Sequence, residues 1–124
     1  MATTIYGTYQ TDGSANPISL SVLVGFAQLG ATSITIDGVP KVESTADSNG
    51  IYRENLNISL GSNSDLKGKC LEITSKVNIL KTPANSSLTI NLAGTAPQGY
   101  NMDNPSTGVG VGDVVEYYAS ITFL

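Results

Sequence analysis

Two short stretches of the chain hold most of the side chains that could bind a ligand. The first, "YNMDN", combines an aromatic ring with amide and carboxylate groups from Tyr100, Asn101, Asp103 and Asn104. Loops that carry such groups can hold a sugar between a ring and several hydrogen-bonding side chains, and function concentrates in loops. The same oxygens also suit calcium. One hypothesis is therefore a carbohydrate- or calcium-binding module centred on residues 97–106.

The second stretch, "ADSNG", is a candidate cation site. Asp47 and Asn49 offer the carboxylate and amide oxygens that calcium takes from loops, although the spacing does not match a twelve-residue EF-hand loop. Asp and Asn also dominate turns, because their side chains bond to the local backbone. No other cofactor is expected, so calcium is the one that the sequence leaves open, and turn chemistry is the competing explanation.

The residue types that most enzymes need are absent from the sequence or scattered along it. Histidine is absent and Cys70 is the one cysteine, which excludes Ser-His-Asp and Cys-His nucleophilic systems and the commonest zinc sites. A hydrolase would need two of the scattered carboxylates to meet in a cleft. The run Gly108, Gly110, Gly112 follows a loop and precedes a strand pattern, which is the wrong context for a phosphate-binding loop. We expect a protein that is not an enzyme.

Charge and hydropathy argue against two classes of partner, nucleic acids and membranes. The formal net charge is −4 and the basic residues are dispersed, whereas nucleic-acid binding needs many phosphate contacts by Lys and Arg. The longest apolar run, Val22 to Ala27, is far too short to span a bilayer. We expect neither nucleic-acid binding nor membrane insertion. The segment "MATTIYGTYQ" shows no signal-peptide pattern, so the localisation is open, with an extracellular surface or a particle favoured over the cytoplasm.

An alternation of apolar and polar residues with a period of two dominates the chain and is typical of strands. In "ISLSVLVGFA" every second residue from Ile18 to Phe26 is apolar, and Asp37-Gly38 is a strong hairpin signal. The pattern predicts about eight strands, at residues 3–10, 18–27, 32–36, 39–44, 51–60, 69–80, 86–93 and 113–123. We therefore expect one domain over residues 1–124, an all-β sandwich of mainly antiparallel strands, Ig-like or jelly-roll-like.

One predicted connection is unusually long. Residues 94–112 show neither a strand nor a helix pattern, and compact domains rarely contain unstructured loops beyond about 12–15 residues unless the loop is functional or disordered. This loop includes the "YNMDN" stretch, which is why we consider it the best place for a ligand.

The first and last predicted strands are almost free of charge. "ATTIYGTYQ" has no charged residue, and the final segment "YYASITFL" has none beyond the adjoining Glu116 and the terminal carboxylate. Soluble monomers usually protect strand edges with Lys, Pro or bulges. Both strands could therefore pair within their own sheet or with a neighbouring chain by strand addition. In the last strand, Tyr118, Ser120 and Thr122 are out of phase with the apolar set, and we predict them to be assembly contacts.

Two resemblances point in the same direction. The ending "ASITFL" after a Gly-rich stretch resembles, over about a dozen residues, the terminal strand of bacterial pilin and fimbrial subunits, without their usual cysteine pair. The Thr-, Gly- and Asn-rich composition resembles that of phage and tail-like particle proteins. We expect a non-enzymatic structural or adhesive module that acts through protein contacts, with itself as the main partner in a homo-oligomer and a glycan as the alternative ligand.

Overall fold

The fold was analysed in a computed structural model, which describes residues 2–26, 28–53, 55–94, 97–104 and 109–124. Its described part contains nine strands and one short helix. In chain order these are β1 (Ala2–Tyr9), β2 (Pro17–Val24), β3 (Leu29–Ile36), β4 (Val39–Pro40), β5 (Leu56–Ser62), α1 (Asn63–Leu66), β6 (Cys70–Asn78), β7 (Ser86–Ala93), β8 (Gln98–Asn104) and β9 (Val114–Phe123).

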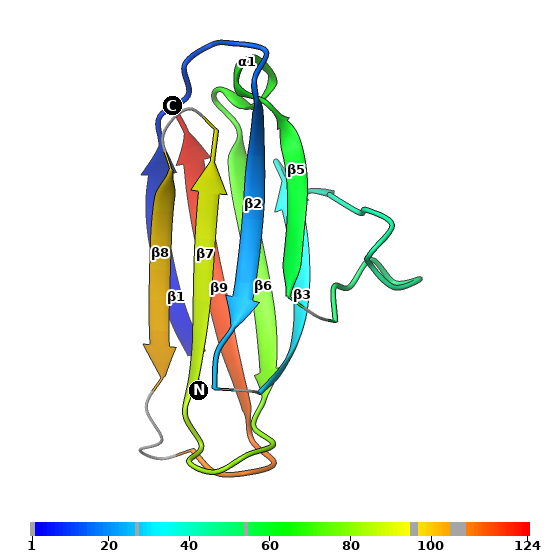
Figure 1. Cartoon of the computed structure of the whole chain (residues 1–124), viewed down its shortest axis with the longest axis vertical. Coiled ribbons are helices and arrows are strands. Elements are labelled where there is room, and N and C mark those ends of the chain that lie inside the picture. Colours follow the sequence, from blue (N-terminus) through cyan, green and yellow to red (C-terminus); the bar gives the residue numbers. More distant parts are fainter. Residues whose placement is uncertain (1, 27, 54, 95–96, 105–108) are drawn as a thin grey trace.

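The strands form two sheets that face each other (Figure 1). One sheet has five strands in the order β1-β9-β6-β3-β4, and the other has four in the order β5-β2-β7-β8. Neighbouring strands are antiparallel except for β1 and β9, which run parallel with Thr4 opposite Tyr118. The predicted all-β sandwich is confirmed. The last strand, β9, lies inside its sheet, between β1 and β6.

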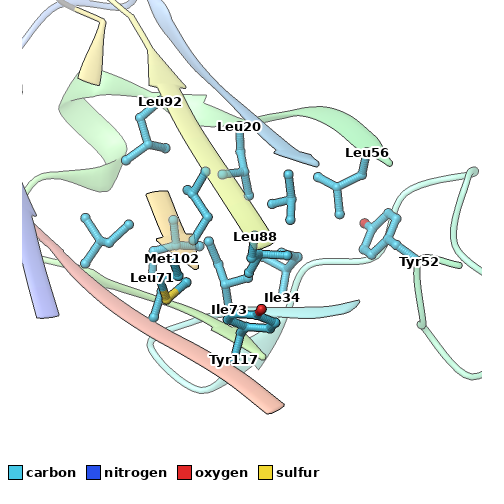
Figure 2. Packing of buried hydrophobic residues seen from close by; sticks show 14 of the residues in the cluster. Leu20, Ile34, Tyr52, Leu56, Leu71, Ile73, Leu88, Leu92, Met102 and Tyr117 are labelled. Atoms are coloured by element: carbon cyan, nitrogen blue, oxygen red, sulfur yellow. The ribbon is translucent and has the colours of Figure 1, made fainter. Parts of the chain in front are cut away.

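The core lies between the sheets, and the period-two pattern explains how it forms. Alternate residues of each central strand point inward, so that Leu20 and Leu88 from one sheet meet Ile73 and Tyr117 from the other (Figure 2). Two polar pairs are also buried. The Tyr117 hydroxyl lies 2.5 Å from that of Ser86, and the Thr32 hydroxyl lies 2.9 Å from that of Ser75. Each hydroxyl thus has a partner, which avoids the cost of an unpaired buried polar group.

A buried glutamine fixes one end of the sandwich, next to the turn between β2 and β3. Gln28 is 7% exposed, and its amide nitrogen donates to the carbonyl oxygens of Lys81 and Asn85 at 3.1 Å. Its amide oxygen accepts from the backbone N–H groups of Leu80 and Lys81 at 2.7 and 3.1 Å. One side chain therefore holds the loop between β6 and β7 in place.

Four details differ from the sequence-based prediction. The segment 94–112, expected to lack strands, contains β8, and the turn after β5 forms helix α1, which Ser62 caps by accepting from the N–H of Asp65 at 3.1 Å. The strand expected at 39–44 ends at Pro40. The strand expected at 51–60 begins at Leu56, apart from a bridge at Tyr52. The hairpin at Asp37-Gly38 is confirmed, because both residues have positive φ, 50° and 79°.

Candidate assembly interface

The two long sides of the sandwich differ in how their strand edges are covered. On the side of β3, residues 39–53 shield the outer edge. Thr32 and Tyr52 exchange backbone hydrogen bonds of 2.9 and 2.8 Å, and the N–H of Lys41 donates to the carbonyl oxygen of Ile34 at 2.9 Å. This covering segment is charged and includes an ion pair between Lys41 and Glu43 at 3.2 Å. Covering segments and charges are the usual protection of a sheet edge.

The same segment also flanks β5, the edge strand of the other sheet on this side, and projects from the sandwich in Figure 1. Three clefts lie between β5 and the segment, with volumes of about 450, 350 and 270 Å³. Charged side chains of Lys41, Glu43 and Arg53 are among the residues that line them. A register shift between Ile18 and Ser19 also interrupts the ladder from β2 to β5. This side of the molecule is thus protected in several ways.

The opposite side ends in β1 and β8, and there the edge of β1 is open. The carbonyl of Tyr9 accepts from the N–H of Leu124 and so points toward β9, whereas the carbonyl of Thr8 points toward β8. Backbone groups alternate sides along a strand, so those of Ala2, Thr4 and Tyr6 point away from β9. Within the described residues they have no backbone partner. We call these three residues the free edge.

The free edge lacks the features that normally block pairing. β1 contains no charged residue and no proline, and its register with β9 is unbroken over eight residues. Tyr6 is 77% exposed, and its ring packs edge to face with the Tyr118 ring, with the centroids 6.4 Å apart. An uncharged, unbulged edge strand of this length is a template for a further strand.

Tyr100 marks where the free edge ends. Its hydroxyl donates to the carbonyl oxygen of Thr8 at 2.6 Å and accepts from the Gln98 amide at 2.7 Å. Its ring lies over Gly7, where an added Cβ would come within 2.6 Å of the ring. Burial raises the pKa of Tyr100 above its ordinary value, although its hydrogen bonds act in the opposite direction. Tyr100 therefore joins the two sheets and closes the edge of β1 beyond Gly7.

The proposed ligand-binding residues do not share one face. β8 is an edge strand with Tyr100 and Met102 turned inward, while Asn101 and Asp103 are exposed on the outer face of the four-stranded sheet. Asn101 accepts a 3.0 Å hydrogen bond from the Thr89 hydroxyl. The structure thus brings Asn101 and Asp103 together and separates them from Tyr100. The side chain of Asn104 and residues 105–106 lie outside the described residues. The carbohydrate hypothesis stays a prediction.

The predicted assembly contacts Tyr118, Ser120 and Thr122 do share one face. They follow one another on the outer surface of β9, with Tyr118 next to Thr4 and Ser120 next to Tyr6. Loss of solvent contact and then the nearby Glu72 carboxylate raise the pKa of Tyr118 above its ordinary value. Because β9 pairs on both sides, its backbone is not available to another chain, and only its side chains could contribute.

Asp47 uses both carboxylate oxygens within its own turn. One accepts from the N–H groups of Asn49 and Ile51 at 2.8 and 3.0 Å, and the other accepts from Nε of Arg53 at 3.0 Å. These partners, with the Ile51 bond the strongest influence, lower the pKa of Asp47. Turn chemistry therefore accounts for Asp47 and Asn49, and a cation placed there would stand next to the Arg53 guanidinium. Among the described residues no group of three acidic or cysteine side chains is placed to hold a metal.

Sequence reasoning named the uncharged first strand but not the residues that matter most on it. Thr4 and Tyr6 are the exposed residues of the free edge, and neither is named in the sequence-based prediction, because a sequence does not show which strand has an unpaired side. Tyr100 was proposed as a ligand platform, whereas it closes the edge at Thr8. The one available signal was the lack of charge in "ATTIYGTY".

The comparisons with known proteins add no family to these observations. No family model matches the chain, and no significant match was found among curated proteins or solved structures. No helix in the described part of the chain is long and apolar enough to cross a membrane.

Proposed function

We propose that this protein is a non-enzymatic structural or adhesive module that associates with further copies of itself through the free edge of β1. The observation that carries the proposal is the contrast between the two sides of the sandwich. The edge of β3 is covered by a charged segment, whereas the edge of β1 is uncharged and unpaired at Thr4 and Tyr6. Strand addition at such an edge gains main-chain hydrogen bonds without a rearrangement of the fold.

The side chains around the free edge also favour protein contact. Tyr6 and Tyr118 present an aromatic pair beside the edge, flanked by the hydroxyls of Thr4, Ser120 and Thr122. Tyrosine is enriched in protein interfaces, where its ring is buried and its hydroxyl finds a partner. The ion pair between Lys76 and Glu116, at 3.9 Å, partly neutralises the charges of this face.

Size-exclusion chromatography with light scattering, run over a wide concentration range, tests the proposal. The wild-type mass should rise above that of one chain as concentration increases. Tyr6→Lys and Thr4→Pro should hold the protein at the monomer mass, because one adds a charge at the edge and the other removes an outward N–H without breaking the ladder to β9. Asn91→Lys, an exposed change on the other sheet, is the matched control and should behave as wild type. A wild-type monomer at every concentration overturns the proposal.

A further inference from the structure

We infer that the strand which joins the free edge is β1 of a second copy of this chain, antiparallel to the first and related to it by a two-fold axis midway between Thr4 and the partner's Thr4. The inference rests on the proposed function and adds to it the partner, the direction and the register. It uses the outward backbone groups of Ala2, Thr4 and Tyr6, which have no backbone partner among the described residues.

The edges of the sandwich favour a two-fold arrangement over a head-to-tail one. A head-to-tail contact would pair β1 with a different edge, but residues 39–53 cover β3 and flank β5, and Tyr100 ties β8 to Thr8. Among the described edge strands, β5 is interrupted by a register shift and β8 carries Asp103, whereas β1 is uncharged and in unbroken register. The strand best suited to pair with β1 is therefore a second β1. Two-fold dimers are also the commonest oligomers, and an uncharged strand opposes no like charges when it meets itself.

The position of the axis follows from counting which backbone groups can pair. With the axis between the two Thr4 residues, Thr4 faces the partner subunit's Thr4, and Ala2 and Tyr6 face the partner's Tyr6 and the partner's Ala2. Every group of the free edge then enters a hydrogen-bonded pair. An axis through Ile5 would bring Ala2 opposite Thr8, whose carbonyl already accepts from Tyr100. An axis through Thr3 would leave Tyr6 without a partner.

This register also gives a consistent arrangement of the side chains. On the outer face, Tyr118 and Thr4 would continue into the partner's Thr4 and the partner's Tyr118, forming one row across the interface. Threonine opposite threonine is a favourable cross-strand pair. The five-stranded sheet would thereby become one continuous sheet of two subunits.

Disulfide trapping tests the register in a chain whose one native cysteine has been removed by Cys70→Ser. The two Thr4 residues on either side of the axis form a hydrogen-bonded pair, in which the Cα atoms are about 5.5 Å apart, a distance that suits a disulfide. Thr4→Cys should therefore give a covalent dimer under mild oxidation. Thr8→Cys, exposed on the same face of the same strand, is the matched control and should cross-link at least about tenfold more slowly. Circular dichroism checks that each variant is folded.

The outcomes separate the inference from the proposed function. If light scattering shows association but Thr4→Cys cross-links no faster than Thr8→Cys, the register is wrong while self-association stands. If the parent chain is monomeric at all concentrations, the proposed function fails. Should Thr4→Cys not fold, a chain carrying both Ala2→Cys and Tyr6→Cys tests the same register, because each new thiol would face the other residue's position in the partner. A failure of this chain to cross-link overturns the inference.

Discussion

The hydroxyl of Tyr100 donates a 2.6 Å hydrogen bond to the carbonyl oxygen of Thr8 and so joins the edge strand of one sheet to that of the other. The contact closes one end of the free edge, and the ring covers Gly7, where a larger residue would not fit without a shift. β1 is therefore held at Thr8 and at the buried Tyr9, whereas Thr4 and Tyr6 stay exposed.

Removing the Tyr100 hydroxyl should weaken the contact between β8 and β1 without preventing self-association. Tyr100→Phe loses the hydrogen bonds to Thr8 and Gln98, both partly exposed, and a cost of about 0.5–1.5 kcal/mol per bond in the free energy of unfolding is expected. The carbonyl of Thr8 becomes available, so the free edge grows longer. Urea denaturation at low protein concentration measures the loss of stability, and light scattering measures whether the protein still associates. Loss of association in Tyr100→Phe would instead mean that Tyr100 itself contacts the partner.

The buried hydroxyl pair of Tyr117 and Ser86 should show strong coupling in a double-mutant cycle. Tyr117→Phe leaves the Ser86 hydroxyl without its partner in the core, at a cost of about 1–3 kcal/mol. The double variant with Ser86→Ala should recover part of this loss, because no unpaired hydroxyl remains. Urea denaturation of the four proteins gives the coupling energy. Strictly additive effects would show that the hydroxyl pair is not formed.

Alkaline pH gives a second test at Tyr117. Burial raises the pKa of Tyr117, with Ser86 acting to lower it and Asp103 to raise it. A raised pKa in the folded state means that the stabilisation is complete below the unfolded value near 10 and is lost as the pH rises through the folded value. The decrease in the free energy of unfolding above pH 10 should therefore be smaller in Tyr117→Phe than in wild type. An equal decrease in both proteins would show that titratable groups other than Tyr117 cause the loss of stability at alkaline pH.

Gln28 should matter more for stability than an ordinary polar residue. Gln28→Met keeps the approximate size of the side chain but removes four hydrogen bonds to the loop after β6, and we expect a loss of about 1–3 kcal/mol. Gln10→Met is the control, since Gln10 is exposed and its amide donates to only two carbonyls. Urea denaturation compares them, and equal losses would contradict this role for Gln28.

The Asp47 turn predicts a pH dependence of stability with a definite sign. Its folded pKa is lowered by the Ile51 amide, the Arg53 side chain and the Asn49 amide, so its stabilisation is present above the unfolded value near 3.8 and is lost as the pH falls through the folded value. Asp47→Ala should therefore lower Tm at pH 7, and the difference from wild type should shrink in acid. If the difference in Tm between wild type and Asp47→Ala grew in acid, the stabilising role of the Asp47 carboxylate in this turn would be contradicted.

Calcium is the alternative use of the same side chain and can be tested on the same two proteins. If Asp47 were a ligand, calcium would raise the Tm of wild type but not of Asp47→Ala. The occupied carboxylate oxygens predict no such difference.

Much of the fold could be predicted from local pattern, because the period of two reports which face of a strand is buried. β7 was expected at residues 86–93 and spans Ser86–Ala93, and Asp37-Gly38 forms the expected turn. β8 was missed because Gly99, Asn101 and Asp103 have low strand propensity, so that only Tyr100 and Met102 marked its inner face. Here packing against β7 overrides propensity.

The candidate interface was less accessible to sequence reasoning than the fold. The sequence shows that β1 is uncharged, but the parallel pairing of β1 with β9 joins residues more than 100 positions apart, and no local signal encodes it. Only the sheet order reveals that β9 is enclosed and β1 is at the edge. The sequence predicts that either terminal strand could pair with another chain, and of the two only β1 lies at an edge of its sheet, with Tyr118 beside it.

Residue-resolved hydrogen exchange on β1 tests the central claim most directly. The amides of Ile5 and Gly7 point toward β9, whereas those of Thr4 and Tyr6 point outward. At low concentration Ile5 and Gly7 should be protected while Thr4 and Tyr6 exchange freely. At high concentration Thr4 and Tyr6 should become protected as well, which is the result that strand addition predicts. Unchanged, rapid exchange of Thr4 and Tyr6 in a protein that has associated would contradict the account.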